Sequence, residues 1–231
     1  MYLSGEEHHH LSRVARVKIK EKVWLFDGLG MNYLARVEEI GRERTRLVVL
    51  QTMAAPEPKV KMALGQALLK AKKMEFVLQK TTELGISEFL PVVTDRAIVR
   101  VQEKGDRRRQ RWQRISKEAA KQSRRAVFPS ILQPSTLADV VKTRNEEKKL
   151  FLSEHRGALL KDLLLPSSHH GMTEIPASVF ILVGPEGGWT QAEENIMLNH
   201  DYEAVSLGKA VLRAETAAIS AVALISHFWL L

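Results

Sequence analysis

The chain has 231 residues, of which 45% are hydrophobic and 27% charged, a balance typical of a globular protein with one large domain or two small ones. It contains no cysteine, which excludes disulfides, cysteine-ligated zinc and a thiolate nucleophile, including the cysteine adduct that one class of base methylation requires. No apolar run approaches the roughly 18 residues of a membrane helix, and the N-terminus lacks a signal-peptide pattern, so we expect no membrane partner and a cytoplasmic location.

The formal net charge of +8 is concentrated in one segment. Residues 100–125 contain eleven Lys and Arg but only three Asp and Glu, so the rest of the chain is balanced. A concentrated basic patch favours a polyanionic partner, most simply nucleic acid. The alternative is a basic helix that only meets solvent.

The first part of the chain predicts a small all-β domain. Strands are expected over 14–19, 22–26, 33–37 and 46–50, with few helix signals between them. This spacing favours a small β-barrel or sandwich. Two prolines then mark a linker over 53–58, so we expect one domain over residues 1–55 and a second over 56–231.

After the linker, strands and helices alternate, which predicts an α/β domain with a mostly parallel sheet covered on both faces. Strands are expected over 60–64, 88–93, 149–152, 178–183 and 204–207. Helices are expected over 70–84, 107–125, 190–199 and 215–231, and a loop over 166–176. The spacing of Thr190 and Glu193 predicts a capping box at the start of one of these helices.

The basic segment predicts a helix with two different stripes. Trp112, Ile115, Ala119 and Ala126 fall on one stripe, which can pack against the domain. A neighbouring stripe carries Arg107, Arg111, Arg114, Lys121 and Arg125. Guanidinium groups match phosphate geometry, so this stripe could contact a nucleic-acid backbone.

Two turns near the C-terminus each join an expected strand to an expected helix. They are Gly184–Gly188, with the sequence Gly-Pro-Glu-Gly-Gly, and Leu207–Arg213. Ligands in open parallel sheets bind at the carboxyl ends of strands, and glycine lets backbone approach a ligand closely. The first turn has neither dinucleotide nor phosphate-loop spacing, and Glu186 disfavours a phosphate. From spacing alone, the first turn fits a purely structural turn as well as a ligand-binding loop. Arg213 and Glu215 fit a local ion pair as well as a chemical role.

The triplet His8–His10 is the other candidate for chemistry. Three adjacent histidines could hold a metal ion, but surface or packing histidines are more common. We therefore expect no metal site.

The motifs together resemble the ribosomal RNA small subunit methyltransferase E family, which methylates uridine N3 and belongs to the knotted SPOUT superfamily. The resemblance spans nearly the whole chain. Its sharpest parts are Gly184–Gly188, Leu207-Gly208, Leu212-Arg213 and Glu215-Thr216-Ala217. Supporting parts are Lys73-Met74-Glu75-Phe76, Gln79-Lys80, Glu83-Leu84-Gly85, Arg111-Trp112-Gln113, Gln122-Ser123 with Arg125, and Arg13-Val14-Ala15-Arg16.

The resemblance implies a PUA-like β-barrel that helps to hold RNA, followed by an α/β domain that ends in a trefoil knot. It also implies a homodimer that binds S-adenosyl-L-methionine at three strand ends, releases S-adenosyl-L-homocysteine and uses no metal. The residues expected to contact the cofactor are Leu152, Ser153, Glu154, Leu182, Val183, Gly184, Pro185, Glu186, Gly187, Gly188, Leu207, Gly208, Val211, Leu212 and Arg213.

The implied reaction is methyl transfer to N3 of a uridine in 16S rRNA, within the assembled small ribosomal subunit. Arg213 is expected to stabilise the negative charge that the uracil ring gains on losing its N3 proton. Glu215 could accept that proton or orient Arg213, and orientation is favoured because a carboxylate beside an arginine is a weak base. The residues expected to contact RNA are Arg13, Arg16, Arg111, Lys121, Arg124 and Arg125.

Two other functions fit the same residues. One is a SPOUT methyltransferase that acts on a ribose 2′-hydroxyl or on tRNA. The other is an RNA-binding ribosome-assembly factor that keeps the cofactor pocket without turnover, although the intact Arg213 and Glu215 disfavour it.

Overall fold

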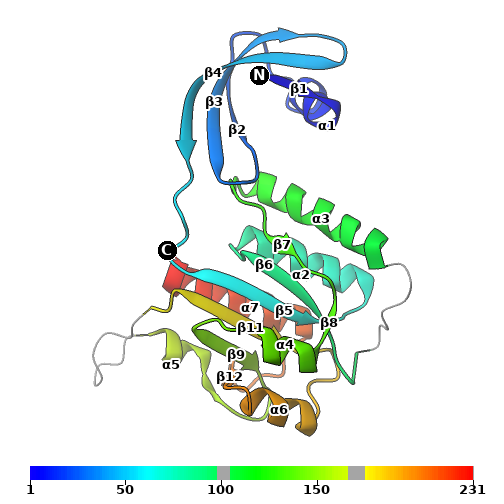
Figure 1. Ribbon diagram of the computed structural model, residues 1–231, viewed down its shortest axis with the longest axis vertical. Coiled ribbons are helices and arrows are strands. Elements are labelled where there is room, and N and C mark those ends of the chain that lie inside the picture. The colour runs from blue at the N-terminus through cyan, green and yellow to red at the C-terminus, as the bar shows by residue number, and fades with distance from the viewer. Residues whose placement is uncertain (98–104, 166–174, 231) are drawn as a thin grey trace. The chain divides into compact units, whose positions relative to one another are not determined.

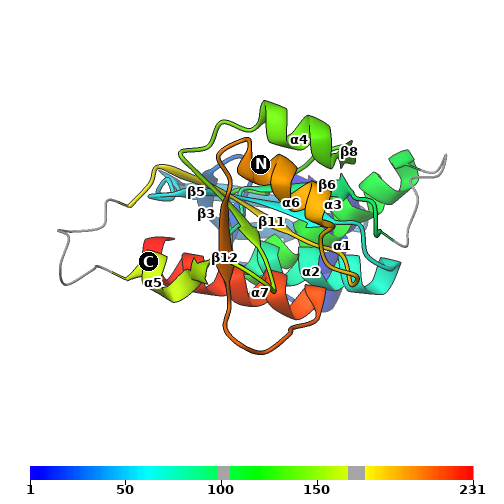
Figure 2. The same ribbon diagram turned by 90° about the horizontal axis from the view of Figure 1, so that it is seen from below.

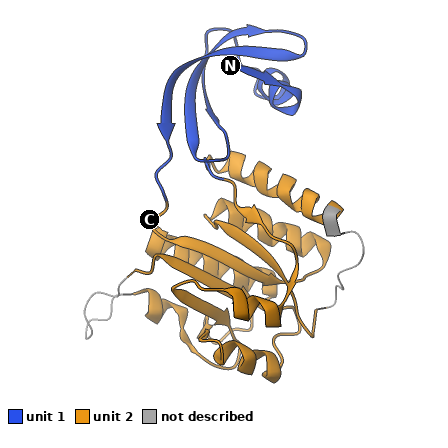
Figure 3. Ribbon diagram, in the orientation of Figure 1, with its two compact units in different colours: residues 1–57, 125–127 blue, residues 58–124, 128–231 orange. Residues whose placement is uncertain are grey.

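The computed structural model describes residues 1–97, 105–165 and 175–230, so most of the expected loop at 166–176 lies outside the described residues. The chain forms two compact units (Figure 3). Unit 1 contains residues 1–57 and 125–127, and unit 2 contains residues 58–124 and 128–231. The chain therefore leaves unit 2 for three residues in its middle and then returns to it.

Unit 1 is built on an antiparallel sheet in the order β1-β4-β3-β2. The strands are β1 (Tyr2–Ser4), β2 (Lys22–Phe26), β3 (Met31–Ile40) and β4 (Arg44–Ala54). Its small core contains Leu11, Ala35, Val37 and Leu47. The returning segment joins this unit, since Gly30 N–H donates to the Ala126 carbonyl and Val127 bridges to Gly28 and Leu29.

The strand expected over 14–19 is wrong. The helix α1 (Gly5–His9) runs into a π-helical turn, η1 (His10–Val14), and the residues after it lie outside any strand. Val14 is 62% exposed and Ile19 is 55% exposed, so the alternating apolar residues do not mark a buried face. The short strand β1, which the sequence did not predict, pairs with β4 instead.

Unit 2 contains a fully parallel sheet in the order β10-β12-β9-β11-β5-β6-β7, with β8 also paired to β6. The strands are β5 (Lys61–Ala67), β6 (Glu88–Val93), β7 (Ser130–Ile131), β8 (Ser135–Thr136), β9 (Lys148–Leu152), β10 (Ala158–Leu159), β11 (Ser178–Val183) and β12 (Glu203–Ser206). The parallel sheet predicted from the alternating pattern is confirmed.

Helices cover both faces of this sheet (Figures 1 and 2). One face carries α2 (Ala71–Glu83) and α7 (Ala214–Ile225), which continues as the π-helical turn η2 (Ser226–Leu230), and the other carries α4 (Leu137–Thr143) and α6 (Gln191–Leu198). Successive residues of β11 point to opposite faces, so Val179 and Ile181 pack in one core cluster and Phe180 and Leu182 in the other. A strand buried on both faces reads as a continuous apolar run, as this one does.

The remaining helices are α3 (Gly105–Gln122), which packs against α2, and α5 (Leu160–Leu164), which packs against α7. The capping box of Thr190 and Glu193 is confirmed at the start of α6. The helix expected over 107–125 ends at Gln122, so Arg125 lies beyond it and belongs to unit 1. The short helices α4 and α5 were not predicted.

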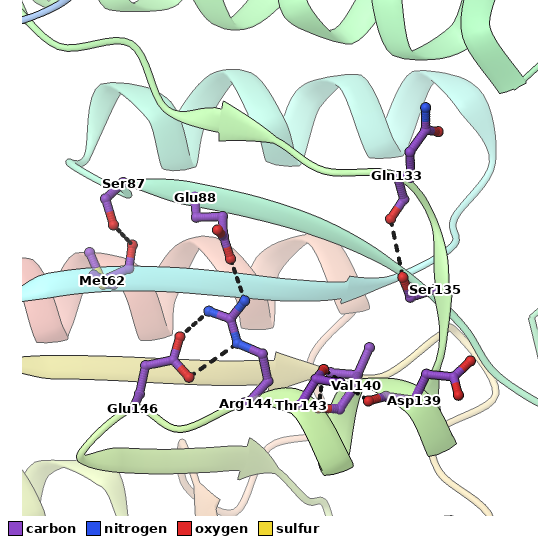
Figure 4. Close-up of polar contacts among 10 residues, drawn as sticks. All are labelled: Met62, Ser87, Glu88, Gln133, Ser135, Asp139, Val140, Thr143, Arg144 and Glu146. Carbon is purple, nitrogen blue, oxygen red and sulfur yellow. Dashed lines mark hydrogen bonds and ion pairs between the residues drawn. The ribbon is translucent and has the colours of Figure 1, made fainter.

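An ion cluster around Arg144 fixes the start of β9 (Figure 4). Arg144 donates to Glu88 of β6 at 2.5 Å and to both carboxylate oxygens of Glu146, and its guanidinium lies 4.3 Å from the centre of the Phe180 ring. Burial lowers the pKa of Arg144, but the pairs with Glu146 and Glu88 outweigh it and leave the pKa raised. The cluster therefore holds β9 in place beside β11.

Candidate functional site

A cleft lies where three neighbouring strands end at one edge of the unit 2 sheet. Because β9 lies between β12 and β11, the last residues of these strands, Ser206, Leu152 and Val183, meet there. The loops that follow these strands wall a cavity of about 420 Å³. We call it the strand-end cleft. The strand order reverses at β5, the neighbour of β11. From β5, the strands β6 and β7 extend to one side of the sheet, and β11, β9 and β12 extend to the other.

The expected cofactor residues gather in this cleft. The cleft is lined by Leu152, Ser153, Glu154, Val183, Gly184, Pro185, Glu186, Gly187, Gly188, Leu207, Gly208, Val211, Leu212 and Arg213. Leu182 is the exception, because it is fully buried in the core below the cleft. Outside the explicit list of expected cofactor residues, the cleft is also lined by Lys73, Arg96, His155, Trp189, Glu194, Ser206, Lys209, Ala210, Ala214 and Ala217.

The turn at Gly184–Gly188 is held from two sides. Arg96, just after β6, donates from Nη1 to the carbonyls of Gly187 at 2.9 Å and Trp189 at 3.2 Å. The Trp189 indole N–H donates to the Leu152 carbonyl at 2.8 Å, which links the turn to the end of β9. Gly188 has φ of +67°, a backbone conformation that favours glycine. The backbone of the turn is therefore fixed before any ligand arrives.

A buried carboxylate supports the loop after β9. Glu194 of α6 is 8% exposed and accepts hydrogen bonds from the Ser153 hydroxyl and from Arg156 Nε, both at 2.8 Å. A buried carboxylate needs such partners, because leaving it unpaired is costly. Ser153 is thus positioned by α6 as well as by its own strand.

Lys73 joins two loops of the cleft through ion pairs. Its Nζ lies 3.3 Å from Glu186 Oε1 in the glycine-rich turn and 3.3 Å from Glu215 Oε2 in the first turn of α7. Desolvation lowers the pKa of Lys73, but the contacts with Glu186 and Glu215 outweigh it and leave the pKa raised. Lys73 is therefore a cation that is ion-paired with two carboxylates.

This arrangement differs from the expected pairing of Glu215 with Arg213. Glu215 contacts Lys73, and within the described part of the chain Arg213 takes part in no ion pair. Arg213 is the N-cap residue of α7 and is exposed, with its position on the cleft wall. The guanidinium is thus available to an incoming group.

Lys73 stood within a motif of the family resemblance, but nothing in the sequence pointed to its position. It lies on α2, which follows β5, and β5 neighbours β11 only through the strand order of the folded sheet. The position of Arg96, which follows β6, likewise depends on the strand order of the folded sheet. The sequence feature that could have indicated Arg96 is a charged residue shortly after a buried strand.

The expected RNA-contacting residues have different surroundings. Arg111 forms a two-pronged ion pair with Glu75 of α2, with distances of 2.6 Å and 2.8 Å. Lys121 lies 3.3 Å from Glu118. Arg13 and Arg16 in unit 1 and Arg124 in unit 2 are exposed, as is Arg111 despite its ion pair. Arg125, in unit 1, is partly buried, which lowers its pKa.

The histidine triplet has a structural explanation at one position. His8 is buried, and its Nδ1 lies 2.8 Å from the Thr45 hydroxyl of β4. Among the residues that the structure describes, no group of three or more His, Asp or Glu side chains is arranged to hold a metal ion. None of the described helices is long and apolar enough to cross a membrane.

Both parts of the chain are similar to known RNA methyltransferases. Residues 56–226 match the family model of an RNA methyltransferase domain, and residues 3–50 match that of an RNA methyltransferase PUA domain. The chain is 32% identical to the ribosomal RNA small subunit methyltransferase E of Synechocystis, covering 97% of this chain and 72% of that protein. It is 27% identical to the Bacillus subtilis protein of the same name, covering 97% and 89%. The crystal structure of the Neisseria gonorrhoeae protein of that name, bound to S-adenosyl methionine, matches with a TM-score of 0.85 and 32% identity, covering 99% of this chain and 92% of that chain.

Proposed function

The chain belongs to the ribosomal RNA small subunit methyltransferase E family, and from this premise we propose that it methylates N3 of a uridine in 16S rRNA. It is an S-adenosylmethionine-dependent rRNA methyltransferase with an N-terminal PUA-like domain. The observation that carries the proposal is the strand-end cleft, where the glycine-rich turn and Arg213 line one cavity.

The cleft fits the cofactor by its shape and by its charges. Gly208 has φ of +130°, and no heavy atom lies within 4 Å of the Cβ position at Gly188 or Gly208, so a ligand can approach this backbone closely. Glu154 and Glu186 place carboxylates on a wall that would face a ligand with a sulfonium and an ammonium group. When bound, S-adenosylmethionine supplies the electrophilic methyl group. Alignment of the two reactants is then the main task of the protein.

Arg213 is the residue that we assign to the chemical step. Uracil carries a proton on N3 at neutral pH, and its loss leaves negative charge on the ring oxygens. A guanidinium stays protonated and can donate to one of these oxygens, which leaves N3 open to the methyl group. Its exposed position on the cleft wall, without an ion-pair partner in the described residues, supports this role.

The orienting role expected of Glu215 is retained in our proposal, but by an indirect contact. Because it contacts Lys73, we propose that it fixes the first turn of α7, and with it Arg213, through Lys73 rather than by a direct pair. A carboxylate beside an ammonium group has little tendency to take a proton. We therefore propose that another group or solvent accepts the N3 proton.

Further parts of the proposal concern the setting of the reaction. We propose that the enzyme acts as a homodimer on assembled small subunits in the cytoplasm, and that unit 2 contains the trefoil knot of the superfamily. The apolar helix α7, with Ala217, Ile219 and Ala223 only partly buried in the single chain, supports a contact between copies. The PUA-like domain and the exposed arginines Arg13, Arg16 and Arg124 support RNA binding.

The test is methyl incorporation from labelled S-adenosylmethionine into small ribosomal subunits that lack the modification, with the product nucleoside identified by mass spectrometry. The proposal expects 3-methyluridine, and more of it on assembled subunits than on free rRNA. A 2′-O-methylated nucleoside or a methylated tRNA would contradict the N3 assignment. Cofactor binding without incorporation into any of these RNAs would contradict the proposed catalytic activity.

A further inference from the structure

Helices α2 and α3 are neighbours (Figure 1). A second depression, outside the strand-end cleft, is lined by residues of these two helices. Its volume is about 510 Å³, which is within the range of ligand sites. We call it the α2–α3 groove. It is lined by Lys72, Glu75, Phe76 and Gln79 of α2 and by Arg114, Ile115, Glu118, Ala119 and Gln122 of α3. The spacing of these residues places them on one face of each helix.

The groove presents an aromatic ring between amide groups. Phe76 is 47% exposed, an unusual exposure for a ring of this size within a concave surface. Gln79 lies about one helical turn further along α2, and Gln122 is on the facing helix. Unpaired nucleobases are recognised by stacking on aromatic rings and by hydrogen bonds to their edges. Phenylalanine and glutamine offer these two kinds of contact.

The charges in the groove favour an anionic occupant. Its two carboxylates are already paired, Glu75 with Arg111 and Glu118 with Lys121. Neither Lys72 nor Arg114 has an acidic partner in the described part of the chain. The groove therefore carries a positive charge that no described side chain of unit 2 neutralises.

The groove begins beside the strand-end cleft. Lys72 lines the groove, and the next residue, Lys73, lines the cleft. Both lie in the first turn of α2, where the helix dipole also favours phosphate. A polynucleotide that presents one nucleotide to the cleft would have its neighbours within reach of the groove.

We propose that the α2–α3 groove binds an unpaired nucleotide adjacent to the target, with its base stacked on Phe76 and its phosphates near Lys72 and Arg114. The inference rests on the proposed function, because it takes RNA as the substrate. A second copy of this chain fits the groove less well. In a symmetric contact the same patch meets itself, so the unpaired cations would face each other.

The experiment measures binding of the full chain to a short oligouridylate. Phe76→Leu keeps an apolar side chain but removes the ring, and it should weaken binding roughly ten-fold. Phe76→Trp should retain the affinity. Arg114→Gln should reduce the slope of binding against salt by about one. Lys142→Gln, an exposed lysine of α4 on the opposite face of the sheet, is the matched control and should change neither quantity.

Three results would overturn the proposal. The first is a Phe76→Leu variant that binds the oligouridylate as the wild-type protein does, and the second is an RNA duplex that competes as well as the single strand. The third is a Phe76→Leu variant with an altered sedimentation coefficient, which would make the groove a contact between copies. The product nucleoside of the unchanged protein tests the proposed function separately, so failure of one proposal can be told from failure of the other.

Discussion

The strand-end cleft and helix α3 are built in different ways. In the cleft, hydrogen bonds from the Trp189 side chain to the Leu152 carbonyl and from the Arg96 side chain to the Gly187 carbonyl connect one loop to another. On α3, long cationic side chains lie at the surface, and some of them, such as Arg111, are already paired. A site whose backbone is held by a few specific hydrogen bonds should lose much of its function through a single substitution. A surface of cations should lose it in small steps that depend on salt.

The largest expected effect is on the chemical step. Arg213→Ala should lower methyl transfer by at least ~100-fold, because the uracil oxygens lose the cation that stabilises them. Affinity for S-adenosylmethionine, measured by calorimetry, should change little, since Arg213 is exposed and the glycine-rich turn is held by other residues. Loss of cofactor binding in this variant would contradict the assignment.

The next effect concerns the fixed backbone of the cleft. Gly188 has φ of +67° and Gly5 has φ of +58°, and neither has a heavy atom within 4 Å of its Cβ position. An alanine at either position should cost about 1–2 kcal/mol of stability. Gly188→Ala should also weaken cofactor binding by roughly ten-fold, about 1.4 kcal/mol, because the strained turn shifts. Gly5→Ala is the matched control in unit 1, and an equal loss of cofactor affinity there would refute a local effect.

A smaller effect is expected on the cationic surface. Arg124→Gln should reduce the slope of RNA binding against salt by about one and leave cofactor affinity unchanged. Arg111→Gln should change the slope less, because Arg111 already neutralises Glu75. Filter binding to small ribosomal subunits at several salt concentrations measures both. Equal slopes for the two variants would show that the ion pair opens when RNA binds.

The smallest effect appears only at alkaline pH. Because its folded pKa is raised above the ordinary value of 10.5, Lys73 contributes stability that is complete below pH 10.5 and is lost as the pH rises through the raised value. The difference in unfolding free energy between the wild-type protein and the Lys73→Gln variant should therefore be constant below pH 10.5 and shrink above it. Denaturant titrations across this range measure the difference. A gap that does not shrink would show that Lys73 acts through packing.

The sequence predicted the fold where burial or capping leaves a clear local pattern. The run at 178–183 is apolar on both faces and forms β11, and the capping box at Thr190 begins α6. It failed where apolar residues are exposed, as at Val14 and Ile19, and where an element is too short to show a period, as in β1.

For the candidate site, sequence order located the loops but not their neighbours. The strand-end positions Leu152, Gly184 and Leu207 were expected together and do line one cleft. The link of Lys73 to Glu186 and Glu215 was not expected, because it depends on β5 lying beside β11. Local patterns cannot show which distant strand becomes a neighbour.

The three residues that return to unit 1 also bear on how the protein is made. Ala126 and Val127 complete unit 1, yet the chain between Pro58 and Arg124 belongs to unit 2. Synthesis runs from the N-terminus, and units tend to fold as they emerge. A nascent chain that has not yet emerged past Val127 therefore carries an unfinished unit 1, although β5, α2, β6 and α3 have already been made. The N-terminal unit begins first, but it is completed only after the first segment of unit 2, residues 58–124, has been made.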